Sequence, residues 1–299
     1  EELTRVADFD GILLDSAGRL LTRPTGPVLD DVGHPHPSSV CDGFFAHVAG
    51  RVGMGVFDAA RFTRGMQKAV LAPLSSLFWL GEIRADPQRI YRLSSVPPHD
   101  VGRTGEHVAA YLYHHPDVVA TVNEWFDKLK VGYHVDERSL GPQERGYVEL
   151  RLLDTQRDTP TPLDVSLADV GYGVGQLLPI VTQALSQRDE TIAIQQPEVH
   201  VHPALQADLA DLFIHCAKPT GPYEGADKQF IIETHSEHLV LRMQRRIREG
   251  TLNPDDLVIL YVRRGTEGSQ VRRIRLAEDG DFLDEWPGGF FPERLRELL

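Results

Sequence analysis

Short apolar segments alternate with stretches of helical length through the second half of the chain. Residues 147–153 alternate apolar and polar side chains, as a half-buried strand does, and further strands are predicted at 191–194, 229–232, 257–262 and 270–276. Helices are predicted between them at 176–187, 203–216 and 236–249, where apolar residues recur at helical spacing. This alternation predicts an α/β fold, a mostly parallel sheet flanked by helices.

The first half of the chain shows a weaker pattern. Residues 1–75 are rich in Gly, Pro and His, which favour loops, and 57–79 are partly helical in pattern with a break at Pro73. A loop is predicted over 84–103, and two helices separated near Pro116 over 105–130. We therefore expect a helical and loop-rich lobe at 1–145, a core lobe at 146–262 and a small C-terminal region at 263–299.

The composition is that of an ordinary globular protein, with 41% hydrophobic and 25% charged residues. No apolar run approaches the roughly 18 residues that a membrane-spanning helix needs. Two cysteines, Cys41 and Cys216, are too few for a disulfide framework. We therefore expect a cytoplasmic protein that does not contact a membrane.

Charge is distributed unevenly along the chain. The net charge of −13 argues against a surface adapted throughout to nucleic acid. Between Arg242 and Arg275, however, nine arginines accompany four acids and no lysine. Four of them fall on one predicted helix and are candidates for contact with DNA or RNA: Arg242, Arg245, Arg246 and Arg248. A solvated surface and an acidic partner are the alternatives.

A glycine-rich loop, Asp169-Val-Gly-Tyr-Gly-Val-Gly-Gln176, directly precedes an apolar helix. Gly171, Gly173 and Gly175 leave backbone N–H groups unshielded, and at a helix N-terminus such groups favour an anion. A plain turn explains the glycines equally well.

Two polar runs each follow a predicted strand. The first is Gln195-Gln-Pro-Glu-Val-His-Val-His202, after which Pro203 is placed to begin a helix, and the second is Glu233-Thr-His-Ser-Glu-His238. Ligands of open α/β sheets collect beyond the carboxyl ends of the strands, so these runs are candidate site segments. Alternate residues Glu198, His200 and His202 are also possible metal ligands.

These three segments together resemble the C-terminal half of an ABC-type ATPase head of the SMC-like and overcoming-lysogenization-defect-like kind. The resemblance implies a P-loop NTPase sandwich with an incomplete N-terminal portion. It identifies 171–176 as the signature loop, 191–198 as the Walker B strand and its acid, and 203–211 as part of a D-loop region that includes His202, Gln206 and Asp208. His235 corresponds to the switch histidine. Residues 281–292 resemble an appended C-terminal domain of unknown function, and 81–125 also resemble that bacterial subfamily.

The chain departs from this resemblance in two ways. No phosphate loop of the form G-x-x-x-x-G-K-[ST] occurs, so we expect that the chain begins inside the head, the alternative being a complete partner subunit. The Walker B acids are replaced by Gln195 and Gln196, whose amides cannot accept a proton as a general base. Glu198 and Glu233 remain candidates for activating water.

The resemblance implies ATP and Mg²⁺ as ligands, with Mg²⁺ expected at the Gln195 position. It also implies a homodimer or higher assembly that sandwiches ATP, an effector protein partner, and a role in bacterial DNA maintenance or anti-phage defence. The first alternative is an inactive interaction subunit, or a variant trapped with nucleotide by a Glu-to-Gln change in the Walker B segment, that binds partners or nucleotide without turnover. Gln195 and Gln196 suggest such weak or abolished hydrolysis. A metal-dependent nuclease built on Glu198, His200, His202 and His238 is the second.

Overall fold

The computed structural model describes residues 77–141, 146–157, 163–186, 190–217, 228–266 and 268–287. The chain divides into two units, Glu1–Ser76 and Leu77–Leu299, and all of the described residues lie in the second. The predictions made for residues 1–75 therefore fall outside the described residues. The helical pattern predicted over 57–79 is wrong at its end, because residues 77–79 lie in a β-strand.

Three parallel strands carry the candidate site. They are β1 (Leu77–Leu80), β6 (Glu190–Gln195) and β7 (Lys228–Glu233), in the order β1-β6-β7. The strands predicted at 191–194 and 229–232 are thus confirmed and pair directly, Ala193 with Ile231. The α/β class with a parallel sheet is confirmed.

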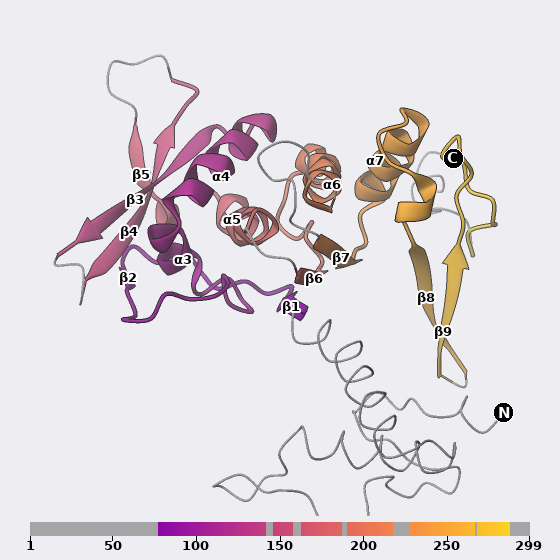
Figure 1. Cartoon of the computed structure of the whole chain (residues 1–299), viewed down its shortest axis with the longest axis horizontal. Helices are drawn as coiled ribbons and strands as arrows, with labels where there is room; N and C mark the ends of the chain where they lie inside the picture. Colours follow the sequence, from indigo (N-terminus) through magenta and orange to yellow (C-terminus); the bar gives the residue numbers. More distant parts are fainter. Residues whose placement is uncertain are drawn as a thin grey trace, which may run out of the picture. The chain divides into compact units, whose positions relative to one another are not determined.

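Helices α5 (Tyr172–Ala184) and α6 (Pro203–Ala217) cover one face of this sheet (Figure 1). Phe78, Leu80, Ile192 and Ile194 point to that face and are buried in one core with both helices. Pro203 begins α6, as predicted. On the opposite face Leu77, Trp79 and Ile231 are 45%, 42% and 57% exposed, although a parallel sheet is usually covered on both sides.

A second, antiparallel sheet lies on the other side of the helices (Figure 1). It consists of β2 (Tyr91–Arg92), β4 (Tyr147–Asp154) and β3 (Tyr133–Leu140), with β5 (Asp164–Ser166) paired to β4. Helices α3 (Val108–His114) and α4 (Pro116–Lys128) pack against it and meet near Pro116, as predicted. The β3–β4 hairpin crosses the domain boundary expected at residue 145.

The last described elements are α7 (Glu237–Arg248), β8 (Ile259–Gly265) and β9 (Gly268–Ile274). Strands β8 and β9 pair antiparallel with each other, and neither is joined to the parallel sheet within the described residues. This hairpin crosses the second expected boundary, at residue 262. Among the described helices, none is long and apolar enough to span a membrane.

The buried side chain of Lys228 donates hydrogen bonds at the C-terminal end of α5. Lys228 is 5% exposed, and its ammonium group donates to the carbonyl of Ala184 at 2.7 Å and to both the carbonyl and the hydroxyl of Ser186. The last carbonyls of a helix lack partners within the helix, and a cation there is favoured by the helix dipole. Lys228 thus joins the start of β7 to the end of α5.

We expect Lys228→Met to destabilise the protein by about 2–4 kcal/mol, because two buried carbonyls would each lose a donor. Gln229→Met, at the exposed neighbouring position, is the control and should change stability by less than about 0.5 kcal/mol. Urea unfolding followed by circular dichroism measures both. Equal stability of the two variants would contradict this role for Lys228.

Candidate functional site

The carboxyl ends of β1, β6 and β7 meet at one edge of the parallel sheet, because the three strands run in the same direction. The segments 81–84, 196–202 and 234–236 follow these strands and form the candidate site. Seven residues predicted from the sequence lie on or next to these segments: Gln195, Gln196, Glu198, His200, His202, Glu233 and His235.

Glu198 ties two of these segments together. Its carboxylate accepts a hydrogen bond from the Thr234 hydroxyl at 2.8 Å and another from the backbone N–H of His235 at 2.6 Å. The two bonds go to different carboxylate oxygens. Glu198 therefore fixes the segment 234–236 that follows β7, while the His235 residue is exposed.

Gln195 and Glu233 pair across β6 and β7. The Gln195 amide Nε2 donates to Glu233 Oε2 at 3.1 Å, and the Glu233 residue is exposed. An amide donor next to a carboxylate leaves one negative charge where a carboxylate pair would carry two. The position that the resemblance assigns to the Mg²⁺ ligand is thus neutral and hydrogen-bonded.

Arg84 belongs to the site, and the sequence analysis gave it no role. It follows β1, is 2% exposed, and its Nη2 donates to the carbonyl of Gln195 at 3.0 Å and to that of Gln196 at 3.4 Å. Its Nε and Nη1 have no hydrogen-bond partner within the described residues. Burial lowers the pKa of Arg84 to about 10, and the charge of Glu198 opposes this shift. The available signal was an arginine four residues after the apolar run Leu77–Leu80.

The turn after β6 is conformationally strained. Gln196 has φ +42° and His200 has φ +61°, the left-handed region that side-chain-bearing residues rarely occupy. The Gln196 N–H donates to the Glu233 carbonyl at 2.8 Å, which extends the β6–β7 pairing past the strand end. Strain of this kind costs about 1–3 kcal/mol per residue and is concentrated at functional sites.

The glycine-rich loop packs against this turn. Helix α5 begins at Tyr172, and no side chain caps Gly171 before it. A Cβ on Gly173 would lie 2.6 Å from the His200 carbonyl oxygen, whereas a Cβ on Gly171 would meet no atom within 4 Å. The Tyr172 ring contacts His200 edge-on, with ring centroids 4.8 Å apart. Gly173 is therefore required by packing, and Gly171 faces open space.

A strap formed by residues 85–92 holds the loop from the other side. The Tyr172 hydroxyl donates to Asp86 at 2.9 Å, and Arg89 donates two bonds to Asp169 at 2.6 and 2.5 Å. Both contacts are exposed, so each adds little stability. Their value is in positioning the loop.

The last residues of the predicted loop, Gly175 and Gln176, lie within α5, which begins at Tyr172 and not at residue 176 as predicted, and both are buried. Gly175 packs on Pro87, and a Cβ there would lie 2.5 Å from the proline Cγ. Gln176 is 1% exposed, and its Nε2 has no partner within the described residues. The contact between the Gln176 side chain and a phosphate therefore stays a prediction, and in this conformation the side chain is not at the surface.

The three residues predicted for a D-loop region, His202, Gln206 and Asp208, form local hydrogen bonds and ion pairs. His202 Nδ1 accepts from the Ala204 N–H at 3.2 Å, at the start of α6. Gln206 Nε2 donates to the Val201 carbonyl at 3.0 Å, and its Oε1 accepts from Ser236, the residue that caps α7, at 2.8 Å. Asp208 forms an ion pair with Arg242 at 2.9 Å.

The three-ligand metal site considered for Glu198, His200 and His202 is not formed. No group of three His, Cys, Asp or Glu side chains in the described part of the chain is arranged to hold a metal ion. Glu198 is bonded to Thr234 and His235 instead, and His200 turns in the left-handed conformation. The metal-dependent nuclease alternative therefore lacks its ligand set.

The α7 arginines are engaged within the chain. Arg242 and Arg246 both bond Asp211, and side-chain exposure is 17% and 27% respectively. Arg245 bonds Glu249 at 2.7 Å. Arg248 bonds Asp281 at 3.0 Å. These pairs fit the solvated-surface alternative, and nucleic-acid contact by these arginines stays a prediction.

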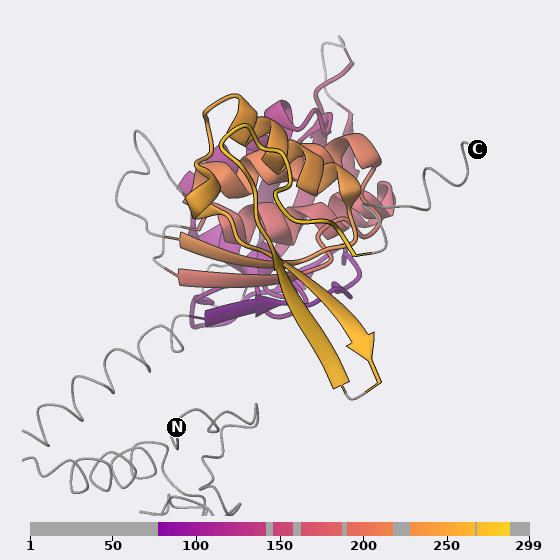
Figure 2. The same ribbon diagram turned by 90° about the vertical axis from the view of Figure 1, so that its right-hand side faces the viewer.

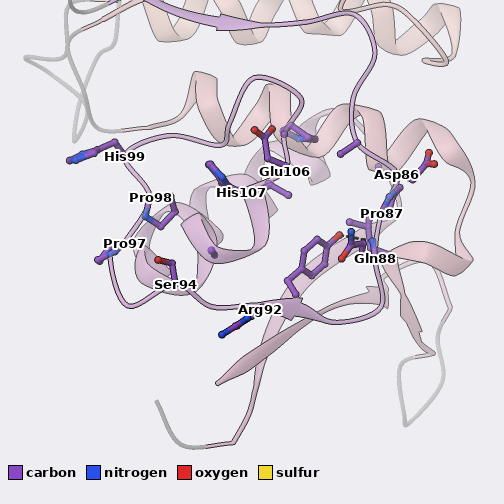
Figure 3. A pocket seen from close by; sticks show the side chains of 18 of the residues that line it. Asp86, Pro87, Gln88, Arg92, Ser94, Pro97, Pro98, His99, Glu106 and His107 are labelled. Carbon is purple, nitrogen blue, oxygen red and sulfur yellow. Dashed lines mark hydrogen bonds between the residues drawn. The ribbon is translucent and has the colours of Figure 1, made fainter. Parts of the chain in front are cut away.

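A cavity of about 440 Å³ lies beside α5 and is lined by Pro87, Tyr91, Val108, Gly175 and Pro179, among others. Figure 3 shows Glu106 and His107 on one side of it and Arg92 on the other. The lining includes both the acidic residues Asp86 and Glu106 and the basic residue Arg92, so it selects no particular ligand charge.

Residues 131–242 match the protein family described as an AAA domain, putative AbiEii toxin, type IV TA system. This segment is similar to that AAA-domain family. It contains the glycine-rich loop, β6, β7 and His235. No match to a curated protein was found.

Several solved structures are similar at 15% identity. The Smc head domain bound to the C-terminal domain of ScpA from Pyrococcus furiosus has a TM-score of 0.40 and covers 57% of this chain, which spans 37% of that one. The SmcHead bound to the C-winged helix domain of ScpA has a TM-score of 0.42, with 61% and 52% covered. A structure from work on ATP-driven dimerization and DNA stimulated activation of SMC ATPases has a TM-score of 0.40, with 64% and 96% covered.

The packing of the two loop glycines predicts opposite responses to substitution. Gly173→Ala should destabilise the protein by about 1–3 kcal/mol, because the new methyl group would overlap a backbone carbonyl. Gly171→Ala should leave stability unchanged or slightly raised, since its φ of −55° suits alanine. Thermal unfolding of both variants checks this, and a stable Gly173→Ala protein would contradict the packing described for the loop.

Proposed function

We propose that this chain is the signature-loop portion of an ATP-binding head, and that two such heads pair around ATP. The observation that carries the proposal is the meeting of three elements at one edge: the strand-end segments of β6 and β7, the exposed switch-type His235, and the uncapped start of α5. In this proposal the exposed loop at Gly171 faces the phosphates of a nucleotide held by the other head.

Each residue then has a chemical role. Backbone N–H groups in the first turn of α5 donate hydrogen bonds to phosphate oxygens, since these groups are unshielded and lie at the positive end of the helix dipole. His235 donates from its ring to the terminal phosphate. Glu198 positions His235 by holding its backbone N–H and Thr234. ATP supplies the phosphoanhydride bond, and the chain positions it.

The described residues offer few ligands for Mg²⁺. At the ends of β6 and β7, a backbone N–H engages the Glu198 carboxylate, whereas among these residues the Glu233 carboxylate accepts only from the side chain of Gln195, which is neutral. Mg²⁺ usually binds one or two carboxylates together with substrate phosphates, so the residues present do not build a Mg²⁺ site by themselves. We therefore propose nucleotide binding and pairing as the main activity, with slow or absent hydrolysis.

We extend the proposal to a bacterial DNA-maintenance or anti-phage defence system. The support is the description of the matched family as a putative toxin of a type IV TA system. An effector partner belongs to this part of the proposal.

ATP-dependent pairing is tested by light scattering of the full-length gene product with ATP and Mg²⁺. The molar mass should double with ATP, and Gly171→Leu should abolish the increase, because the added side chain blocks close approach to the loop without overlapping the fold. Glu124→Leu places the same side chain on an exposed position of α4 and should pair normally. An unchanged molar mass with ATP, or normal pairing by Gly171→Leu, would overturn the proposal.

The neutral pairing at the strand ends makes a second prediction. Gln195→Glu places two carboxylates about 3 Å apart, which should cost about 1–2 kcal/mol of stability at pH 7 without cations. Millimolar Mg²⁺ should restore this loss in the variant and leave the unsubstituted protein unchanged. Thermal unfolding without nucleotide, with and without Mg²⁺, measures the difference. The interpretation fails if the variant shows no Mg²⁺ response.

A further inference from the structure

The β8–β9 hairpin extends as a two-stranded ribbon beyond the helices (Figure 2). Its strands pair in register from Ile259–Ile274 to Gly265–Gly268, and neither is joined to another strand within the described residues. A two-stranded hairpin is marginally stable by itself in water and needs a covering layer. Each face of the ribbon is therefore expected to pack against another part of this chain or against a partner.

One face is covered at its base by the chain itself. Ile274 is 2% exposed, and Tyr261 on the same face contacts Trp286 with ring centroids 5.7 Å apart. Farther along this face Arg263 donates to the Gln270 side chain at 2.9 Å.

The opposite face is open. It carries three cross-strand pairs: Leu260 with Arg273, Val262 with Val271, and Arg264 with Ser269. Leu260, Val262 and Val271 are 57%, 60% and 62% exposed. We call these six residues the open ribbon face. Its apolar centre lies between two guanidinium groups at diagonally opposite corners.

These two guanidinium groups are available for a partner. Within the part of the chain that the structure describes, no hydrogen bond or ion pair engages the side chain of Arg264 or Arg273, in contrast to the arginines of α7 that bond Asp211 and Glu249. The ribbon from Ile259 to Ile274 carries four arginines and a single acid, Glu267, in its sequence. Its charge is opposite in sign to that of the whole chain.

Charge and apolar area together select the occupant. A second copy of the ribbon is disfavoured, because like charges along an exposed strand oppose pairing between copies. Nucleic-acid phosphates would match the arginines but would be placed against three apolar side chains, which gain nothing from them. Protein interfaces combine an apolar centre with arginine, and extended segments commonly dock on exposed sheet elements.

We propose that the open ribbon face docks an acidic, extended segment of a partner protein. Apolar side chains of that segment lie on Val262, Val271 and Leu260, and its carboxylates pair with Arg264 and Arg273. This proposal does not depend on nucleotide binding at the sheet edge.

The test uses the full chain and a panel of fluorescein-labelled peptides in which alternating valine and threonine are flanked by glutamates. The same peptides with lysine in place of glutamate, and a labelled DNA duplex, are the comparison probes. Fluorescence anisotropy at low salt should show binding of glutamate peptides alone. Arg264→Ser with Arg273→Ser should weaken it about tenfold or more. Val262→Thr with Val271→Thr, which keeps the β-branched shape, should weaken it similarly.

Arg263→Ser with Arg272→Ser is the matched control, since it removes the same charge from the opposite face of the same ribbon. Circular dichroism establishes that all variants are folded. The proposal is overturned by equal losses in the two arginine variants, by no binding of any acidic peptide, or by binding of the duplex that the valine changes leave intact. Light scattering that shows self-association sensitive to the valine changes would assign the face to a second copy and overturn it as well.

Discussion

Parallel pairing on both sides of β6 is the constraint on which the candidate site depends. Because β1, β6 and β7 run in one direction, residues separated by more than a hundred positions, such as Arg84 and Gln195, reach the same edge. The covered face of the sheet is apolar and fixes the three strands in register against α5 and α6. Core packing and strand pairing therefore determine where the residues at this edge lie. The hydrogen bonds at the edge then adjust the positions of individual side chains.

The local pattern of apolar and polar residues was sufficient to predict the strands, but it did not predict which strands pair with each other. Alternation at 147–153 and the apolar runs at 191–194 and 229–232 predicted strands that β4, β6 and β7 confirm. The same reasoning found strands near 257–276 but not that they form a separate hairpin, since pairing depends on contacts that no single segment encodes. The burial of Arg84 and Gln176 was missed for the same reason: both are polar residues whose surroundings come from distant elements.

The acidic and amide side chains at the strand ends are held by hydrogen bonds to one another and to the neighbouring backbone. Both carboxylate oxygens of Glu198 accept hydrogen bonds from the segment after β7. The Gln195 amide donates to the Glu233 carboxylate without adding charge. An edge arranged in this way is stable in the absence of a cation, whereas a pair of carboxylates would need one. The left-handed conformations of Gln196 and His200 add backbone strain at the same edge.

The unequal surroundings of the two loop glycines also bear on how the sequence can drift over evolutionary time. A change at Gly173 would be removed by selection for folding in any descendant, whatever that descendant binds, because the His200 carbonyl leaves no room for a side chain. Position 171 is under no such pressure. Among relatives, glycine retained at 173 would therefore report only an inherited fold, while glycine retained at 171 would be a record of selection by a ligand.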